Sequence, residues 1–226
     1  MVTGLRLLHT SPVHVPVFEA LRDRSHPGAV LRHLVVPELL DRARTEGPEA
    51  VAPALLGLLA DAGPGGPGEA GGPGPVLVTC STLGAVAEGL TPALGAPVLR
   101  VDRPMAAAAV RTGPRIVVLA TVESTRAPTE ALLAEEAAGA AVSVRTQLVA
   151  GAWERFAAGD TAGCLALVAA AADAVTDADV IVLAQVSIAA VAGLVTTRVP
   201  VLSSPATGLA AGLELLPARR PLDEPT

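Results

Sequence analysis

One cysteine lies where a thiol can take part in acid–base or nucleophilic chemistry. Cys80 follows the apolar run 76–79 and precedes an Ala-rich segment, so we expect it between the end of a strand and the start of a helix. The dipole and the unpaired amides at a helix N-terminus lower the pKa of a thiol and favour the thiolate. Ser81 and Thr82 can cap the same helix and donate hydrogen bonds to an anion. A carboxylate is the ligand that such a site would suit.

Other small polar residues follow the remaining apolar runs of the chain. They are His9, Thr10 and Ser11, then Thr121, Ser124 and Thr125, then Gln185 and Ser187. Ligands of open α/β sheets bind at the carboxyl ends of the strands, so we expect these residues to share one site with Cys80. His9 could polarise the thiol or bind a carboxylate. A second interpretation stays open, in which Cys80 is a buried core residue and the hydroxyls only cap helices.

The elements that would position these residues are short apolar runs alternating with longer Ala- and Leu-rich segments. We predict buried strands at 5–9, 76–79, 116–120 and 180–184, and short strands at 98–101 and 201–202. We predict helices at 16–22, 38–46, 49–60, 83–90, 104–112, 128–138, 161–174 and 188–195. This alternation indicates an α/β fold with parallel sheets.

The chain also repeats itself. Residues 76–90 resemble residues 180–194, and residues 5–11 resemble residues 115–125. Aligned without a gap, Cys80 pairs with Ala184, whereas a shift of one residue pairs it with Gln185. The repeat predicts two similar Rossmann-like lobes related by a pseudo-twofold axis, with a ligand cleft between them. We assign 1–98 and 207–226 to the first lobe and 99–206 to the second.

Composition excludes several classes of chemistry. All 16 basic residues are Arg, and without Lys the chain cannot form a pyridoxal phosphate Schiff base or a Walker A loop. A net charge of −6 and 1% aromatic residues argue against binding to nucleic acid. The four His and two Cys show no zinc-site spacing, so we expect no metal. The apolar stretch 180–195 is too short for a bilayer and no signal-like run is present, so we expect no membrane segment and a cytoplasmic location.

The remaining candidates receive structural roles. The segment 63–75 holds seven Gly and four Pro and is predicted to be a flexible surface loop. Its GxGxxG match precedes a strand instead of following one, which argues against a nucleotide site. We expect core packing for Cys164, a helix-capping role for Asp102, and surface positions for Glu123, Arg103 and Arg126. We expect no direct contact with a ligand from His14, His26 or His33.

Five segments resemble the aspartate/glutamate/hydantoin racemase superfamily. They are HTSPVHVP at 9–16, VLVTCSTLGAVAE at 76–88, VDRPMA at 101–106, VLATVESTRAPT at 118–129 and VIVLAQVSIA at 180–189. The resemblance implies two α/β lobes with the active site between them, and no metal or other cofactor. It also implies that Cys80 is the first of the two catalytic cysteines that the racemases use, one from each lobe. Gln185 stands where the second cysteine would be, and a carboxamide cannot act as the acid or the base in catalysis.

The resemblance implies a cofactor-independent racemase or isomerase that acts on a small carboxylate, such as an amino acid, through proton transfer by Cys80. Three alternatives remain. One is a single-cysteine decarboxylase, although the family's arylmalonate decarboxylase keeps the cysteine of the other lobe. Another is a maleate-isomerase-like enzyme in which Cys80 attacks as a nucleophile. The last is a non-catalytic protein that binds a small anion. Family members often form homodimers, which the resemblance allows here too.

Overall fold

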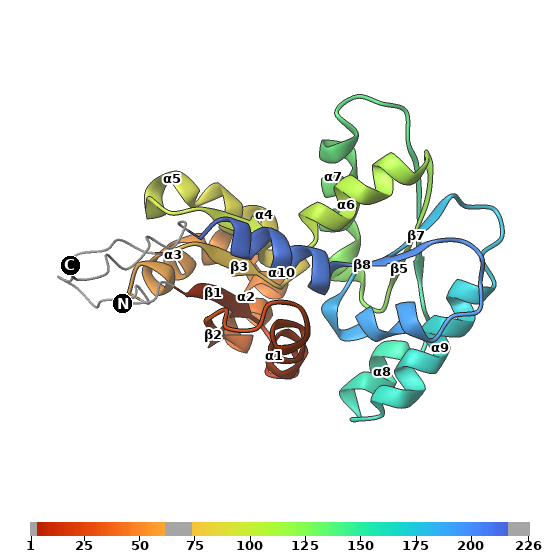
Figure 1. Ribbon diagram of the computed structural model, residues 1–226, viewed down its shortest axis with the longest axis horizontal. Coiled ribbons are helices and arrows are strands. Elements are labelled where there is room, and N and C mark those ends of the chain that lie inside the picture. Colours follow the sequence, from red (N-terminus) through yellow and green to blue (C-terminus); the bar gives the residue numbers. More distant parts are fainter. Residues whose placement is uncertain (1–3, 62–73, 217–226) are drawn as a thin grey trace, which may run out of the picture.

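The computed structural model, which describes residues 4–61 and 74–216, has two lobes that are each built on a four-stranded parallel sheet (Figure 1). The first sheet has the order β2-β1-β3-β4, and the second has the order β6-β5-β7-β8. The strands of the first sheet are β1 (Leu5–His9), β2 (Leu31–Val35), β3 (Val76–Val78) and β4 (Val98–Arg100). Those of the second are β5 (Arg115–Ala120), β6 (Ser143–Leu148), β7 (Val180–Leu183) and β8 (Val201–Ser203). The predicted fold class is therefore confirmed.

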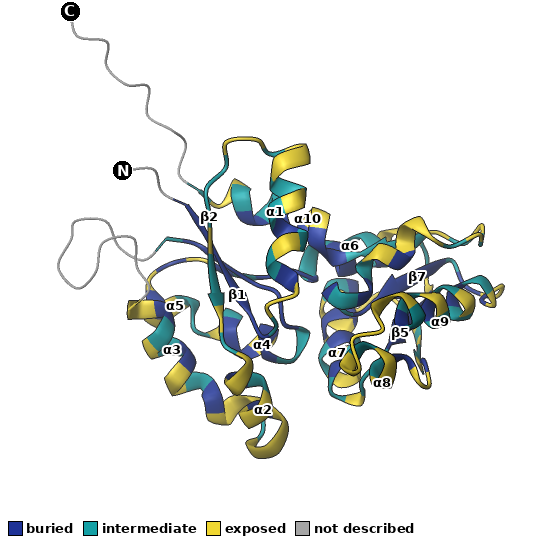
Figure 2. Cartoon of the chain, turned by 90° about the horizontal axis from the view of Figure 1, so that it is seen from below, coloured by how far each residue is buried: buried dark blue, intermediate teal, exposed yellow. Residues whose placement is uncertain are grey.

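The inner strands are buried because helices cover both faces of each sheet. Every residue of β1, β3 and β7 is buried, and in β5 only Arg115 is exposed. Such strands appear in the sequence as continuous apolar runs. Figure 2 shows the same division, with buried strands inside and exposed residues on the outer faces of the helices. The edge strands β2 and β6 mix exposed and half-buried residues, and neither was predicted.

Helices follow the strands in the same order in both lobes. The first lobe holds α1 (His14–Ser25), α2 (Pro37–Glu46), the 3-10 helix η1 (Pro48–Val51), α3 (Ala52–Asp61), α4 (Ser81–Gly89) and α5 (Thr91–Leu94). After β4 come α6 (Arg103–Thr112), η2 (Glu123–Thr125), α7 (Arg126–Ala137), α8 (Ala152–Ala157), α9 (Thr161–Asp173), η3 (Val186–Gly193) and α10 (Ser204–Glu214). Of these, α5, η2, α8 and α10 were not predicted.

The helix predicted at 188–195 is instead the 3-10 helix η3. Its residues Ile188 and Val191 are fully buried and lie three positions apart, which is the period of a 3-10 helix. Both are β-branched, and such residues lose side-chain freedom in an α-helix. The packing of two β-branched side chains on the second sheet therefore favours the tighter helix.

The chain crosses between the lobes twice. The first sheet continues to Arg100, because Leu99 and Arg100 pair with residues of β3. After β8 the chain returns in α10, which Figure 1 shows lying along the first lobe. Leu209 of α10 belongs to the same buried cluster as Leu5 and Leu77 of the first sheet. Residues 217–226 and most of the segment predicted as a loop, up to residue 73, lie outside the described residues.

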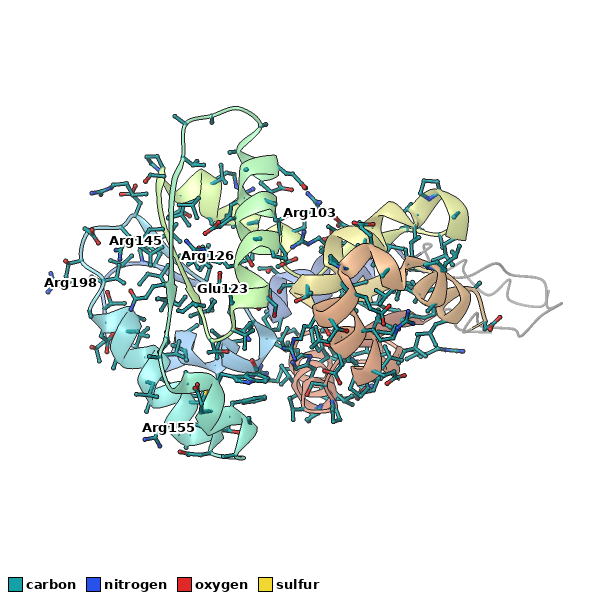
Figure 3. The ribbon with its side chains drawn as sticks, turned by 180° about the vertical axis from the view of Figure 1, so that it is seen from behind. Arg103, Glu123, Arg126, Arg145, Arg155 and Arg198 are labelled. Carbon is teal, nitrogen blue, oxygen red and sulfur yellow. The ribbon has the colours of Figure 1, made fainter. Side chains whose placement is uncertain are left out.

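Ion pairs stabilise the segment where the chain first crosses between the lobes. Asp102 was expected to cap α6, but it makes no side-chain cap and instead forms a buried ion pair with Arg100, with 2.9 Å between Oδ1 and Nε. Arg103 was expected at the surface, and its side chain is instead only 31% exposed. It lies where the lobes meet (Figure 3) and pairs with Glu88 of α4 and with Glu135 and Glu136 of α7.

None of the helices in the described part of the chain has the combination of length and hydropathy that a membrane span requires.

Candidate active site

A cavity of about 200 Å³ lies between the lobes, at the carboxyl ends of the strands. The first lobe contributes the turns after β1 and β3 and one face of α2. The second contributes η2, α8 and the start of η3. The lining residues are Thr10, Ser11, His14, Pro37, Leu40, Asp41, Arg44, Thr79, Cys80, Ser81, Thr82, Val122, Ser124, Thr125, Trp153, Phe156, Gln185, Val186 and Ser187. The volume suits a small molecule held by both lobes at once.

Cys80 lies on the wall of this cavity, at the position expected for it between β3 and α4. It is the N-cap residue of α4, has an extended backbone, and is 7% exposed. Because the first amides of a helix have no partner within the helix, an anion beside Cys80 would meet hydrogen-bond donors and the positive end of the dipole. The thiol is free, so it remains available for chemistry.

Gln185 occupies the matching position of the second lobe. It is the N-cap residue of η3, just as Cys80 is the N-cap residue of α4. The preceding residues match as well, since Thr79 donates its amide to Leu8 of β1 and Ala184 donates its amide to Leu119 of β5. Of the two alignments that the repeat left open, the structure therefore favours the one that pairs Cys80 with Gln185.

The Gln185 carboxamide has a fixed orientation. Its Oε1 accepts hydrogen bonds from the amide of Thr121 at 2.7 Å and from the Thr121 hydroxyl at 3.0 Å. Its NH₂ group has no partner among the described residues and is not buried, so it remains a donor for a ligand in the cavity. Thr121 itself does not line the cavity and acts on it through Gln185.

The hydroxyl groups fall into two sets. The Ser81 hydroxyl donates to the Ala184 carbonyl at 3.0 Å, and the Thr82 hydroxyl donates to the Ser124 carbonyl at 3.4 Å. Both bonds join the start of α4 to the second lobe. The other predicted hydroxyls at the cavity, those of Thr10, Ser11, Ser124, Thr125 and Ser187, lie on its wall and can contribute to a carboxylate site.

His9 differs most from its expected position. It is fully buried, and both ring nitrogens are engaged, with Nδ1 at 2.8 Å from Thr79 Oγ1 and Nε2 at 2.8 Å from His33 Nδ1. Burial is the main cause that lowers its pKa from 6.5 to about 3, and the rings of His14 and His33 lower it further. His9 is therefore neutral and reaches the cavity through Thr79 and through the ring of His14, which its own ring meets. Packing, which the sequence does not show, turns its ring inward.

Several lining residues were not predicted. His14, expected to have no direct role, is 9% exposed and lines the cavity, and burial lowers its pKa to about 4. Trp153 and Phe156 of α8 are two of the three aromatic residues in the chain, and that rarity was a signal in the sequence. Arg44 of α2 lies over the Trp153 ring, with its Cζ 5.7 Å from the ring centroid. This contact joins the two lobes across the cavity.

The other candidates lie away from the cavity. Cys164 is buried in the core of the second lobe, where burial raises its pKa. Glu123 and Arg126 do not line the cavity. Arg126 forms exposed ion pairs with Glu123 and Glu130, which belong to the same lobe (Figure 3). Within residues 4–61 and 74–216, no three His, Cys, Asp or Glu side chains form a group that could hold a metal ion.

The two buried imidazoles should make the protein less stable in acid. The rings of His9 and His14 have folded-state pKa values of about 3 and about 4, whereas in the unfolded chain both take up protons near 6.5. As the pH falls, the unfolded state therefore binds protons before the folded state does. The free energy of unfolding is highest above pH 6.5 and decreases as the pH falls toward 3. Urea unfolding across this range measures the effect.

The control for this pH dependence is His26, the one histidine outside the buried group. His14→Gln should weaken the loss of stability in acid, whereas His26→Gln should leave it as in the wild type. The same pH dependence in both variants would contradict the assignment.

Comparisons with known proteins fit this geometry. Residues 16–212 match the family model described as Asp/Glu/hydantoin racemase. No curated protein sequence matches the chain. Among solved structures, aspartate racemase from Picrophilus torridus has a TM-score of 0.65 at 14% identity, covering 93% of this chain and 92% of that one. Glutamate racemase from Aquifex pyrophilus has a TM-score of 0.59 at 17% identity, covering 95% and 84%.

Unliganded arylmalonate decarboxylase is also similar, with a TM-score of 0.53 at 24% identity, covering 94% of this chain and 92% of that one. At these identities the likeness shows a shared fold. Racemases and a decarboxylase thus share the two-lobed architecture described above.

Proposed function

The chain belongs to the Asp/Glu/hydantoin racemase family, and on that premise we propose that it is a cofactor-independent enzyme that transfers a proton at the α carbon of a small carboxylic acid. Cys80 is the acid–base group. The observation that carries the proposal is the position of its thiol, on the wall of the interlobe cavity at the start of α4 and matched in the other lobe by Gln185.

The cavity supplies what an α-proton transfer needs. Removing that proton places negative charge on the carboxylate, which takes on the character of an enolate. Donors already fixed in place stabilise such charge without the cost of reorganising water. The amides at the start of α4, the NH₂ group of Gln185 and the lining hydroxyls are donors of this kind. The thiolate of Cys80 then accepts the proton, and the thiol returns it.

The absence of a second thiol at Gln185 determines the stereochemistry that we expect. Inversion at carbon requires a base on one face and an acid on the other. An amide can hold the carboxylate or the enolate but cannot exchange a proton. Cys80 acting alone therefore delivers protons to one face, which gives exchange with retention, or protonation after loss of carbon dioxide.

Two other functions use the same cavity. In the first, Cys80 adds to a double bond or a carbonyl as a nucleophile, as in a maleate isomerase, and a mass increase on Cys80 after trapping with substrate would identify it. In the second, the cavity binds a small anion without turnover.

Proton NMR in heavy water tests the proposal directly. The full chain is incubated with amino acids, hydroxy acids, malonates and maleate, and the α-proton signal is followed with the optical rotation. Loss of the signal with retained chirality, or deuterium incorporation as carbon dioxide leaves, supports one-faced transfer. Loss of chirality would show that a second proton-transfer group exists. Binding of these acids with no exchange or conversion would favour the anion-binding function.

A further inference from the structure

Three of the four histidines form a group beside the cavity, in which His9 and His14 are buried and His33 is half-buried. His9 ends β1, His33 lies on β2, and His14 begins α1. The rings of His9 and His33 stack with 5.1 Å between centroids, and those of His9 and His14 meet edge to face at 6.0 Å. Burying imidazoles is unfavourable unless their nitrogens are paired, so such a group calls for an account of its hydrogen bonds.

The hydrogen bonds of this group form one continuous chain. Thr79 Oγ1 lies 3.5 Å from His14 Nδ1 and 2.8 Å from His9 Nδ1. His9 Nε2 lies 2.8 Å from His33 Nδ1, and His33 Nε2 lies 2.8 Å from Glu19 Oε1. The first member lines the cavity, and the last is 31% exposed. The chain therefore connects the cavity to solvent.

His14 is the open end of this chain. It is nine-tenths buried, and its Nδ1 faces Thr79. Its Nε2 has no partner among the described residues, yet no buried side-chain nitrogen or oxygen there is left unpaired, so Nε2 must be accessible. His14 lines the cavity and also a second, mainly apolar hollow between α1 and η3. A ligand or solvent in either space can therefore contact Nε2.

We propose that His14 is a second acid–base group of the cavity, and that Thr79, His9, His33 and Glu19 form a proton relay that connects it to solvent. The proposal rests on the proposed function and extends it, because it adds a proton donor that is connected to solvent. His14 belongs to the same lobe as Cys80, so the exchange that we expect remains one-faced. His14 would touch the substrate. The other four residues act through it and are positioning and relay residues.

The proton transfers balance along the chain. Cys80 thiolate breaks the C–H bond and becomes a thiol, which leaves the electron pair on the substrate as the enolate. His14 Nε2–H gives its proton to the α carbon while His14 Nδ1 receives one from the Thr79 hydroxyl. Thr79 receives the proton of His9 Nδ1–H, and His9 Nε2 receives the proton of His33 Nδ1–H. His33 Nε2 takes one proton from solvent at the end beside Glu19, so every ring ends neutral. After the product leaves, a proton that enters at His14 Nε2 reverses these shifts and restores the chain, while the Cys80 thiol loses its proton to solvent.

One hydroxyl rotation completes the path. The Thr79 hydroxyl has a second acceptor, the Leu8 carbonyl at 3.0 Å, so its hydrogen can point to Leu8 or to His14. Neutral His9 suits its place in the middle of the chain, because one nitrogen donates while the other accepts. Simultaneous transfer also means that no ring has to carry a negative charge.

The charged groups around the relay lie at its two ends. Glu19 pairs with Arg22 on α1, which holds the carboxylate at the outer end. The charged residues that line the two cavities with His14 are Asp41 and Arg44 of α2 and Arg24 of α1. The charged residues that line the two cavities are unchanged in the variants proposed below, so a change in those variants reports on the relay itself.

The first test does not depend on activity. Ring-nitrogen NMR of the full chain follows His14 in the wild type, His33→Gln, Glu19→Gln and the control His26→Gln. We expect both relay variants to move the His14 resonances and the control to leave them in place. Glu19→Gln changes a partly exposed side chain, so it keeps the test valid if His33→Gln does not fold. His14 resonances that are the same in all four proteins would overturn the relay.

The second test uses any substrate whose exchange requires Cys80. His14→Gln should lower kcat by about 10²- to 10⁴-fold with little change in KM, which is the usual contribution of a general acid or base. In mixtures of light and heavy water, the wild-type rate should curve with deuterium content, whereas His33→Gln should give a straight line. An unchanged kcat in His14→Gln would overturn the proposal. Exchange that persists in Cys80→Ala would instead overturn the proposed function and leave the NMR test of the relay standing.

Discussion

Replacing Cys80 with alanine should lower the rate of α-proton exchange by about 10³-fold or more. In the proposed reaction the Cys80 thiolate removes the α proton, and general acid–base groups contribute about 10²- to 10⁴-fold. The helix amides and the hydroxyls would still bind the carboxylate, so kcat should fall far more than KM changes. Proton NMR in heavy water measures both quantities.

The matched control is the other thiol of the chain. Cys164 is buried in the core of the second lobe and does not line the cavity, so Cys164→Ala should keep the wild-type kcat. Cys80→Ser provides a second control, since its hydroxyl keeps the size of the side chain but is a far weaker acid. If Cys80→Ala kept most of the wild-type rate, or if the two alanine variants behaved alike, Cys80 would not be the acid–base group.

The sequence predicts the inner part of this fold well, because buried parallel strands are continuous apolar runs. The runs at 5–9, 76–79, 116–120 and 180–184 became β1, β3, β5 and β7 within a residue at each end. The edge strands β2 and β6 escaped prediction because they mix charged or polar residues with apolar ones and so resemble loops. The other two edge strands, β4 and β8, keep short apolar runs and were predicted.

The site was less predictable than the strands that carry it. The position of Cys80 follows from local sequence, because the end of a strand and the start of a helix fix it. The direction in which a side chain points depends on residues far away in the sequence. His9 turns inward because Thr79 and His33 hold its two nitrogens, whereas His14 turns to the cavity. No local pattern distinguishes these two histidines.

The aromatic wall of the cavity shows the same limit. Trp153 and Phe156 lie on α8, a six-residue helix too short to give a clear apolar period. The contact of Trp153 with Arg44 joins segments that are distant in the sequence, so only the assembled lobes reveal it. The repeat, in contrast, carried long-range information, because it matched Cys80 with either Ala184 or Gln185 before any contact was known.

Replacing Gln185 with cysteine should convert one-faced exchange into racemisation. The variant places a thiol at the N-cap of η3, which matches Cys80 at the N-cap of α4 in the opposite lobe. Two thiols facing each other across the cavity supply the base on one face and the acid on the other that inversion requires. We expect the rate of racemisation to rise by about 10²-fold or more, measured by loss of optical rotation together with deuterium uptake.

The Gln185→Ser variant distinguishes the effect of the new thiol from the effect of losing the amide. Both substitutions remove the acceptor of two hydrogen bonds from Thr121, so both should disturb the turn after β5 equally. Only the cysteine adds a group that can exchange a proton near neutral pH. Racemisation that rises in Gln185→Cys, stays low in Gln185→Ser and disappears when Cys80→Ala is added to the cysteine variant would show that the two N-cap positions act as a pair. Equal racemisation in the cysteine and serine variants would show that they do not.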